Sequence, residues 1–262
     1  MTSPKSQPRT NFVAFKTVLR KEVQRFMRIW LQTLLPPAIT MALYFVIFGN
    51  LIGSRIGTMQ GYSYIQYIAP GIIMMSIITN AYQNVVSSFF GAKFQRHIEE
   101  ILVSPVPLYY VLLGYVVGGM CRGIIVGVIV TCVALSFTDL KIHSYPITFA
   151  VVVITAALFA TAGMINAIFA RKFDDISIVP TFVLTPLTYL GGVFYSIDLL
   201  PEFWRSLSLI NPILYMVNGF RFGMLGVSDI PILYAFVVAV GFCIVLGTLA
   251  LILLYRGIGI RT

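Results

Sequence analysis

Six stretches of the sequence are each long and almost entirely apolar, and this pattern limits the folds that are open to the chain. The stretches cover residues 30–52, 64–90, 108–137, 146–170, 176–197 and 230–255. About 20 apolar residues in a helix are enough to cross the hydrocarbon core of a bilayer. The pattern therefore predicts an all-α membrane protein with six transmembrane helices. Pro36 and Pro37 should distort the first helix, and Pro180 and Pro186 the fifth; neighbouring helices tolerate such breaks within a membrane.

The composition also favours a membrane environment. Hydrophobic residues make up 58% of the chain and charged residues 10%, whereas soluble domains are about 25% charged. The net charge of +9 would suit a nucleic-acid-binding protein, but the basic residues gather at the ends of the apolar stretches, as they do in membrane proteins. No nucleic-acid partner is therefore expected. The three cysteines lie inside apolar stretches and the two histidines stand apart, so neither a disulfide nor a metal site is expected.

The distribution of Lys and Arg predicts the orientation. With the N-terminus in the cytoplasm, thirteen basic residues lie on the cytoplasmic side: Lys5, Arg9, Lys16, Arg20, Lys21, Arg25, Arg28, Lys93, Arg96, Arg171, Lys172, Arg256 and Arg261. Four lie on the outer side: Arg55, Lys141, Arg205 and Arg221. Cytoplasmic loops carry the excess of basic residues in membrane proteins. We therefore expect both termini in the cytoplasm, because a seventh span would put Arg256 and Arg261 outside.

Residues 201–228 are apolar enough to suggest that seventh span, but Asn211-Pro212 divides them. Proline ends or breaks a helix, and each half would be roughly 15 Å long, too short to cross a bilayer. We expect two short helices that enter the outer leaflet and return, which form a re-entrant outer hairpin before the last span.

Residues 9–28 have apolar side chains at steps of three and four, with the basic side chains outside that arc. The apolar positions, continued to the first span, are Phe12, Phe15, Leu19, Val23, Phe26 and Trp30. This pattern predicts an interfacial helix on the anionic inner leaflet. A simple basic anchor and a functional lever both remain open.

None of the nine carboxylates falls inside a predicted span, and Glu22 is expected to face the cytoplasm. Carriers driven by protons or sodium commonly place a carboxylate at mid-membrane. The sequence also has no G-x-x-x-x-G-K-[ST] loop that would cradle a phosphate. If this protein moves a solute uphill, the energy must come from another chain.

The connector between the second and third spans, KFQRHIEEILVSPVP, predicts a helix over residues 93–105. Its apolar stripe consists of Phe94, Ile98, Ile101 and Leu102. Arg96 can pair with Glu99 or Glu100 at helical spacing, and Pro105 and Pro107 close the helix. The helix could merely cap the turn at the membrane surface. The alternative is a docking helix that inserts into a groove on a cytoplasmic partner.

The third predicted span contains Gly119, Gly123 and Gly127 in a repeated G-x-x-x-G pattern. Glycines at this spacing let helices approach closely, and packing within one subunit is favoured over a subunit interface. Arg122 lies roughly 21 Å along this helix, near the midplane. It is either satisfied by neighbouring carbonyls or amides such as Asn166, or serves a transport path.

Other polar and aromatic residues are candidates to line a path through the membrane. With Arg122 and Asn166, the candidates are Asn80, Gln83, Asn84, Tyr189, Phe194 and Tyr195. The aromatic members could form an outer gate with the two short helices. An aromatic belt at the membrane interface is the equally good alternative.

Several blocks resemble, in order and at similar spacing, the permease subunit of an ABC-2 type transporter over essentially the whole chain. These blocks are RFMRIWLQTLLPP, YFVIFGNLIGSRIG, GAKFQRHIEEILVSPVP, FDDISIVPTFVLTPLTYLGGVFYS and LPEFWRSLSLINPILYMVNGFRFG. The resemblance implies six helices, an N-terminal interfacial helix, a cytoplasmic coupling helix in the first loop and re-entrant helices before the last span. It also implies a multi-pass protein of the bacterial inner membrane.

The same resemblance implies a homodimer that works with two copies of a separate ATP-binding subunit. ATP and magnesium would be held by that partner, and no cofactor by this chain, which would not itself be an enzyme. The residues that would couple to the partner are Phe94, Arg96, Ile98, Glu99, Glu100 and Leu102 in the first loop, and Asp174 and Asp175 in a smaller second contact. A secondary transporter and a membrane scaffold or assembly factor without transport remain the alternatives.

Overall fold

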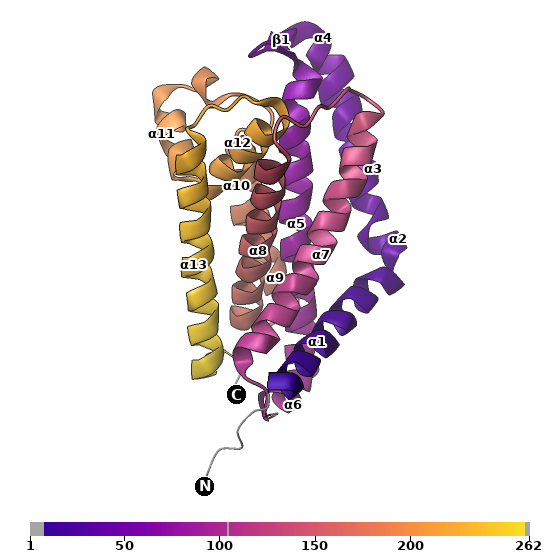
Figure 1. Cartoon of the computed structure of the whole chain (residues 1–262), viewed down its shortest axis with the longest axis vertical. Helices are drawn as coiled ribbons and strands as arrows, with labels where there is room; N and C mark the ends of the chain where they lie inside the picture. Colours follow the sequence, from indigo (N-terminus) through magenta and orange to yellow (C-terminus); the bar gives the residue numbers. More distant parts are fainter. Residues whose placement is uncertain (1–7, 104, 260–262) are drawn as a thin grey trace.

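Long helices that run side by side form a bundle with a short helical cap at one end (Figure 1). The computed structural model describes residues 8–103 and 105–259, with the backbone alone for residues 8–10, 50, 101 and 102. Within these residues, four helical stretches are long and apolar enough to cross a membrane: Trp30–Ile56, Leu108–Leu135, Tyr145–Phe169 and Ile232–Arg256. The chain is thus an all-α membrane protein. Its described strands are a single two-residue pair, β1 (Thr58–Met59) with β2 (Tyr62–Ser63).

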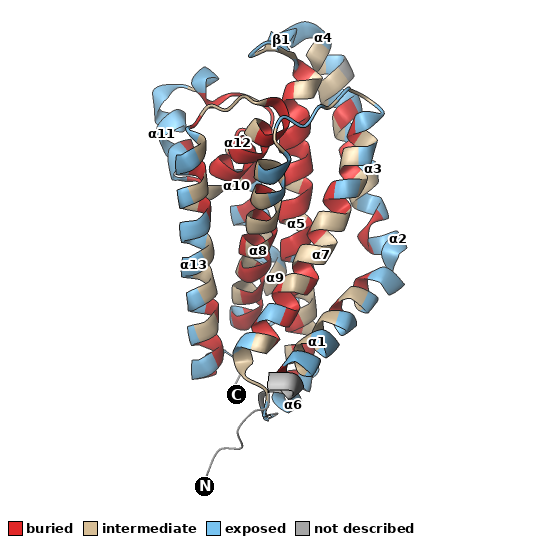
Figure 2. Cartoon of the chain, viewed as in Figure 1, coloured by how far each residue is buried: buried red, intermediate tan, exposed pale blue. Residues whose placement is uncertain are grey.

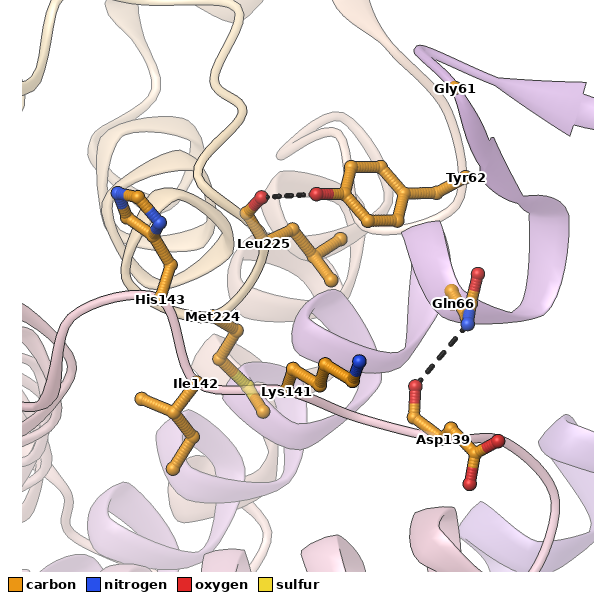
Figure 3. Close-up of a pocket in the computed structure, with 9 residues that line it drawn as sticks. All are labelled: Gly61, Tyr62, Gln66, Asp139, Lys141, Ile142, His143, Met224 and Leu225. Carbon is orange, nitrogen blue, oxygen red and sulfur yellow. Dashed lines mark hydrogen bonds between the residues drawn. The ribbon is translucent and has the colours of Figure 1, made fainter.

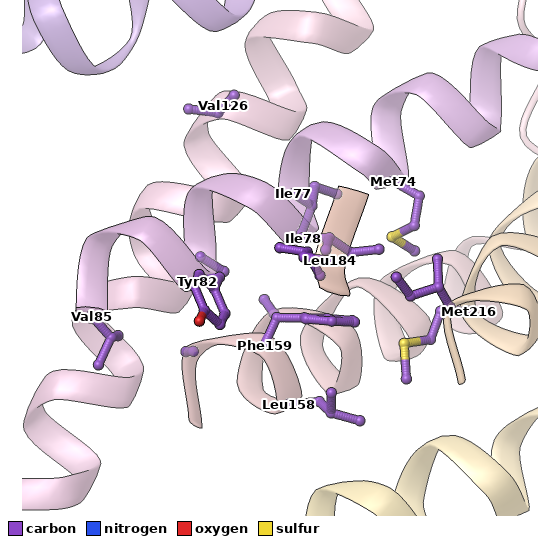
Figure 4. Close-up of a cluster of buried hydrophobic side chains, with 14 of the residues drawn as sticks. Met74, Ile77, Ile78, Tyr82, Val85, Val126, Leu158, Phe159, Leu184 and Met216 are labelled. Atoms are coloured by element: carbon purple, nitrogen blue, oxygen red, sulfur yellow. The ribbon is translucent and has the colours of Figure 1, made fainter. Parts of the chain in front are cut away.

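The centre of the bundle is α5 (Tyr64–Phe94), which packs against α7 (Leu108–Leu135) and α8 (Tyr145–Phe169). Figure 2 shows α5 buried along most of its length, whereas α13 (Ile232–Arg256) is largely exposed on the outside of the bundle. Side chains of α5 meet those of α7 and α8, together with Leu184 and Met216 from later segments of the chain, in one apolar core (Figure 4). Burying α5 on all sides leaves the other helices to face the lipid.

Glycines in α7 permit the close approach of α5. A Cβ atom at Gly119 would lie 2.5 Å from Val85, and one at Gly123 would lie 2.9 Å from the Cβ of Ala81. A Cβ atom at Gly127 would lie 2.6 Å from a side-chain carbon of Ile77. The G-x-x-x-G seam therefore packs within the subunit, which is how small residues bring membrane helices together.

The first predicted span is a chain of short helical segments. They are α2 (Trp30–Thr33), α3 (Leu35–Tyr44), the π-helical η1 (Phe45–Ile52) and α4 (Gly53–Ile56). The helix breaks at Leu34, whose φ of −108° departs from helical values, directly before Pro36 and Pro37. Proline cannot donate to the preceding turn, so the break lies where the sequence predicts a distortion.

The N-terminal helix α1 (Pro8–Arg28) does not lie free of the bundle but packs lengthwise along α7. Val18 lies over Gly114 and Glu22 over Gly118, in notches where a Cβ atom would come within 2.6 Å. Glu22, expected to face the cytoplasm, is only 1% exposed. The sequence did not predict this burial, which arises because the glycine notches of α7 draw this face of α1 into the bundle.

The connector after α5 differs from the single helix expected over residues 93–105. Helix α5 continues through Phe94, and a separate α6 spans His97–Val103. Between them the backbone of Arg96 has a φ of +61°, a left-handed conformation that ends a helix and is uncommon outside glycine. Phe94 therefore belongs to α5, and not to the stripe of the docking helix.

The fifth predicted span ends earlier than residue 197. It consists of α9 (Asp175–Val179), the π-helical η2 (Pro180–Leu184) and α10 (Thr185–Tyr189), five residues each, or roughly 22 Å in all. The chain then turns at Gly192, whose φ is +68°. The next segment lies against Gly71 of α5, where no side chain would fit beside the backbone of Val193. This turn replaces the last helical residues that the apolar pattern predicted.

The short helical cap at the end of the bundle opposite α6 contains η3 (Ile197–Leu199), α11 (Glu202–Ile210) and α12 (Pro212–Leu225). Asn211 separates α11 from α12, and its side chain accepts a hydrogen bond from the N–H of Ile213. This cap explains the break at Asn211-Pro212. Helix α12 is buried over most of its length and packs on α5, α8 and α13.

Candidate functional site

Two loops meet at the α6 end of the bundle, where the expected coupling residues lie. The ring of Phe173, between α8 and α9, packs against Phe90 and Phe94 of α5 at centroid distances of 5.0 and 4.9 Å. Phe94 and Phe173 are 59% and 55% exposed. These aromatic contacts bring the connector between α5 and α6 beside the loop that precedes α9.

Lys93 joins the same two segments. Its Nζ donates hydrogen bonds to the carbonyl oxygens of Ile168 and Ala170, at 2.6 and 2.7 Å. These carbonyls end α8, and a cation there also complements the helix dipole. Burial, with a smaller contribution from the nearby Arg171, lowers the pKa of Lys93 below its ordinary value. The ammonium group is a partly buried tie between α5 and α8.

Helix α6 has one buried anchor and an exposed acidic face. Ile98 is 2% exposed, whereas Glu99 and Glu100 are exposed. A cavity of about 200 Å³ lies between α6, the end of α5 and Arg171. Arg96 makes no salt bridge with either glutamate among the described residues, because its left-handed backbone takes it out of the helix. The side chain of Leu102 lies outside the described part of the chain.

The two aspartates of the second contact differ. The carboxylate of Asp175 accepts hydrogen bonds from the N–H groups of Arg171 and Lys172, at 2.7 and 3.0 Å. These two bonds lower the pKa of Asp175 below its ordinary value. Asp174 is exposed. Asp175 therefore shapes the loop, and Asp174 is the member of the pair that is open to a partner.

A polar stripe runs along one face of α5. It consists of Asn80, Gln83, Asn84 and Ser87, spaced as neighbours on one helical face; the two asparagines are buried and Gln83 is exposed. Arg122 of α7 donates from Nη2 to the Oδ1 atom of Asn80 at 3.2 Å and to the carbonyl of Thr33 at 3.4 Å. Three of the expected path residues on α5 thus share a stripe with Arg122.

Glu22 and Arg25 of α1, which the sequence did not identify as site residues, extend this stripe. Arg25 of α1 donates from Nη2 to the carbonyl and the Oδ1 atom of Asn84, both at 2.9 Å, and to Glu22 at 3.3 Å. Ser88 donates to the other oxygen of Glu22 at 2.6 Å. The i, i+3 spacing of Glu22 and Arg25 was the available signal, but their partner helix lies about sixty positions away in the chain.

Asn166 does not join the stripe, so Arg122 is satisfied in part by Asn80 and not by Asn166. The Nδ2 atom of Asn166 instead donates to the carbonyl of Ile176 at 3.3 Å. This bond lies between the end of α8 and the start of α9. Asn166 therefore belongs with the loops around α6, away from the expected path.

The expected aromatic residues gather at the opposite end of the bundle. Phe194 stacks on Phe48 of η1 at 4.6 Å and lies 5.9 Å from Tyr44 and 6.0 Å from Tyr189. The hydroxyl of Tyr195 donates to the carbonyl of Tyr189 at 2.9 Å. The cluster joins the first helical stretch to the end of α10, a position that suits either a gate or an interfacial belt.

Arg221, which was expected in an outer segment, is fully buried in α12. Its Nη2 donates to the carbonyl of Gly192 at 2.6 Å and its Nε to the carbonyl of Tyr67 at 3.3 Å. Its guanidinium also lies 4.1 Å above the Tyr67 ring, a cation–π contact. The arginine fixes the turn after α10 against α5. The sequence signal for this structural role was the position of an arginine inside an apolar segment.

A polar cavity of about 530 Å³ opens beside the start of α5, at the end of the bundle opposite α6 (Figure 3). Gln66, Asp139, Lys141 and His143 line it, and the amide of Gln66 donates to the carbonyl of Asp139 at 3.3 Å. Within the described chain, no group of three or more His, Cys, Asp or Glu side chains is placed to hold a metal ion. The cavity offers polar contacts but, among the residues described, no assembled metal site.

Two comparisons with known proteins identify the family of the chain. Residues 13–225 match the model of the ABC-2 type transporter family, and the chain belongs to this family. It is similar to the inner membrane transport permease YadH of Escherichia coli strain K12, with 59% identity over 251 residues that cover 96% of this chain and 98% of YadH. Nodulation protein J of Rhizobium meliloti strain 1021 is 25% identical over 219 residues, or 83% of this chain and 79% of that protein. The chain is thus a transport permease and a multi-pass protein of the inner membrane.

Proposed function

We propose that this chain is the permease subunit of an ATP-driven exporter and forms its translocation path. Two copies would assemble with two copies of a separate ATP-binding subunit, which would hold ATP and magnesium. The permease itself would bind no cofactor and perform no covalent chemistry. Membership of the ABC-2 family supports this division of labour.

The observation that carries the proposal is the surface of α6. Ile98 anchors the helix to the bundle, and Glu99 and Glu100 are exposed on it. Since Lys93 and the Phe94–Phe173 contact tie this region to both α5 and the end of α8, a displacement of α6 would reach two core helices together. A coupling helix needs such a connection.

The mechanism follows from that connection. ATP binding would draw the two ATP-binding subunits together and displace the α6 helices. The two permease subunits would then change from an inward-open to an outward-open arrangement, and hydrolysis would reset them. The aromatic cluster around Phe194 would serve as the outer gate, and its stacking on Phe48 and the Arg221–Gly192 bond support this role.

The proposed topology has six spans and cytoplasmic termini. Besides the four apolar stretches, α5 and the α9–α10 segment would cross the membrane, and α11 and α12 would enter the outer leaflet and return. Helix α1 would lie at the inner interface, because Lys16, Arg20, Lys21 and Arg28 are exposed along it and basic residues prefer that surface.

One observation, the buried carboxylate of Glu22, favours a secondary transporter over an ATP-driven exporter. Glu22 is a buried carboxylate, and carboxylates inside membrane proteins often serve proton or sodium coupling. Its oxygens, however, already accept from Arg25 and Ser88. The ATPase experiment below separates the two functions, because a secondary transporter or a scaffold would not respond to ATPase contacts.

The test replaces both exposed glutamates of α6, Glu99→Ala with Glu100→Ala. A charge-assisted contact contributes about 1.5–3 kcal/mol, so stimulation of the ATPase by the permease should fall about tenfold or more. Transport should be lost while expression and membrane insertion are retained. Glu202→Ala is the matched control, since Glu202 is exposed on α11 at the other end of the bundle. Unchanged stimulation in the double variant would reject the coupling role.

A further inference from the structure

The charged side chains that surround the polar stripe on α5 carry more positive charge than negative. Arg25 bonds to Asn84 and Arg122 bonds to Asn80. Asn80 and Asn84 are one turn apart, so the two guanidinium groups meet the stripe at points roughly 6 Å apart along the helix. Glu22 is the single carboxylate bonded to this network within the described chain. Two cations and one anion leave a net positive charge, which is costly in a low-dielectric site unless an anion compensates it.

The hydrogen-bond donors of the stripe are also in excess. A guanidinium has five N–H donors, but Arg122 makes two long bonds, at 3.2 and 3.4 Å. Among the described residues, the Nε atoms of Arg25 and Arg122 and the Nδ2 atom of the fully buried Asn84 have no acceptor. No buried acceptor atom of the stripe lacks a donor among the described residues. The missing partner is therefore an acceptor, and the charge requires an anion.

The position of the stripe identifies where such an anion can come from. Lys21 and Arg28, on the same helix as Arg25, are exposed and must meet water or lipid headgroups. Trp30 and Leu31, directly after α1, are 51% and 57% exposed and suit the boundary between headgroups and acyl chains. Headgroups of the inner leaflet would then lie at the level of Arg25. Arg122 was expected near the midplane, but it meets α5 only one turn from Arg25 and bonds to Thr33, five residues beyond the end of α1. It therefore lies close to the level of Arg25 and within reach of the same headgroups.

We infer that Arg122 and Arg25 bind the phosphate of an anionic lipid headgroup at the junction of α1, α2, α5 and α7. The planar guanidinium matches phosphate oxygens in pairs, which an ammonium cannot do. Glu22 reduces the positive charge and so limits the affinity. This lipid site goes beyond the coupling function and requires neither ATP nor the ATP-binding subunit.

Tryptophan fluorescence can test the site on the permease alone. The chain has two tryptophans, so Trp204→Phe leaves Trp30, which lies in α2 with Thr33, an acceptor of Arg122. The variant is reconstituted in phosphatidylcholine vesicles that contain either dibrominated phosphatidylglycerol or dibrominated phosphatidylcholine. Quenching should show a preference of about fivefold for phosphatidylglycerol, as expected for a basic residue that meets an anionic lipid.

Matched variants separate a built site from general attraction to the membrane. Arg122→Gln should abolish the preference and Arg122→Lys should retain part of it, whereas Glu22→Gln should increase it. Arg28→Gln removes the same charge from an exposed position near Trp30 and should leave most of the preference. Equal losses in Arg28→Gln and Arg122→Gln, or a wild-type preference in Arg122→Gln, would overturn the site.

A competition experiment with free phosphate distinguishes a lipid headgroup from a soluble anion. Inorganic phosphate, compared with chloride at equal ionic strength, should leave the lipid preference unchanged. Loss of the preference in phosphate alone would show that the site takes a soluble anion, and the lipid assignment would then fail. Because no ATPase is present, these outcomes do not depend on whether the coupling proposal holds.

Discussion

Arg221 shows how one buried cation can organise the outer end of this permease. Its side chain is enclosed by α5, α12 and the turn after α10, and it bonds to the carbonyls of Tyr67 in α5 and of Gly192 in the turn. Asp229 acts on the same turn, since it accepts from the hydroxyl of Ser196 and the N–H of Ile197. The turn that presents Phe194 is therefore held from two sides.

Replacing Arg221 should destabilise the protein more than replacing an exposed arginine. Arg221→Met removes the bond to the Tyr67 carbonyl and leaves the buried carbonyl of Gly192 without its donor, and one such unsatisfied group costs about 1–3 kcal/mol. A clearly lower melting temperature in detergent is expected. The control is Arg205→Met, because the Arg205–Asp198 salt bridge is about half exposed and such pairs contribute about 0–1 kcal/mol. Equal melting temperatures would contradict the role of Arg221.

Asp175 gives a second test at the residue scale. Since bonds from the N–H groups of Arg171 and Lys172 lower its pKa, its carboxylate stabilises the loop above the ordinary Asp pKa of about 3.9, and this contribution is lost as the pH falls through the lowered pKa. The loop should therefore stay ordered throughout the neutral range. At neutral pH, Asp175→Asn should speed hydrogen exchange of these two amides, and Asp174→Asn should not. Equal exchange in both variants would contradict this assignment.

Helix α1 is best understood at the scale of whole elements, as a helix joined to the bundle. Its contacts with α7 depend on two glycines, and its contacts with α5 depend on the Glu22–Arg25 pair. Helix α5 also continues toward α6. A movement of the α6 end of α5 would consequently carry α1 with it, which favours the lever over the simple anchor.

Filling one glycine notch should displace α1. A side chain at Gly118 would begin 2.6 Å from the Cβ of Glu22, and overpacking of this kind costs about 1–3 kcal/mol. Gly118→Val should lower the melting temperature and increase tryptic cleavage after Lys21. Gly241→Val is the control, since Gly241 on α13 has open space at its Cβ position. If both variants behave alike, α1 is not held by the notch.

The number of membrane spans, and the side of the membrane on which each loop lies, can be tested on the whole molecule. Single cysteines at Thr58, Glu202, Gln95 and Lys172, all exposed positions, can be introduced after Cys121, Cys132 and Cys243 are replaced. With six spans, an impermeant thiol reagent should label the first two positions in intact spheroplasts. It should label Gln95→Cys and Lys172→Cys only after permeabilisation. Labelling of Gln95→Cys from outside would reject the proposed topology.

The sequence predicted the helical class well because apolar length and proline position are local properties. The break at Leu34 before Pro36 and the division at Asn211 follow from such signals. It did not predict the burial of Glu22 or the early end of the fifth apolar stretch. Both depend on glycines in distant helices, Gly118 and Gly71, that make room for other segments. Residue spacing within one segment carries no information about such partners.

The outer position of α13 has a consequence for how the protein is made. This helix is synthesised after α5, α7, α8 and α12, and it contacts chiefly α8 and α12 while most of its surface stays exposed. The packed centre formed by α5, α7 and α8 is therefore complete in the chain before α13 is synthesised. Domains fold from the N-terminus onward during synthesis, so a nascent chain that stops before Ile232 should already hold its core in the bilayer, with the final helix added as an outer layer.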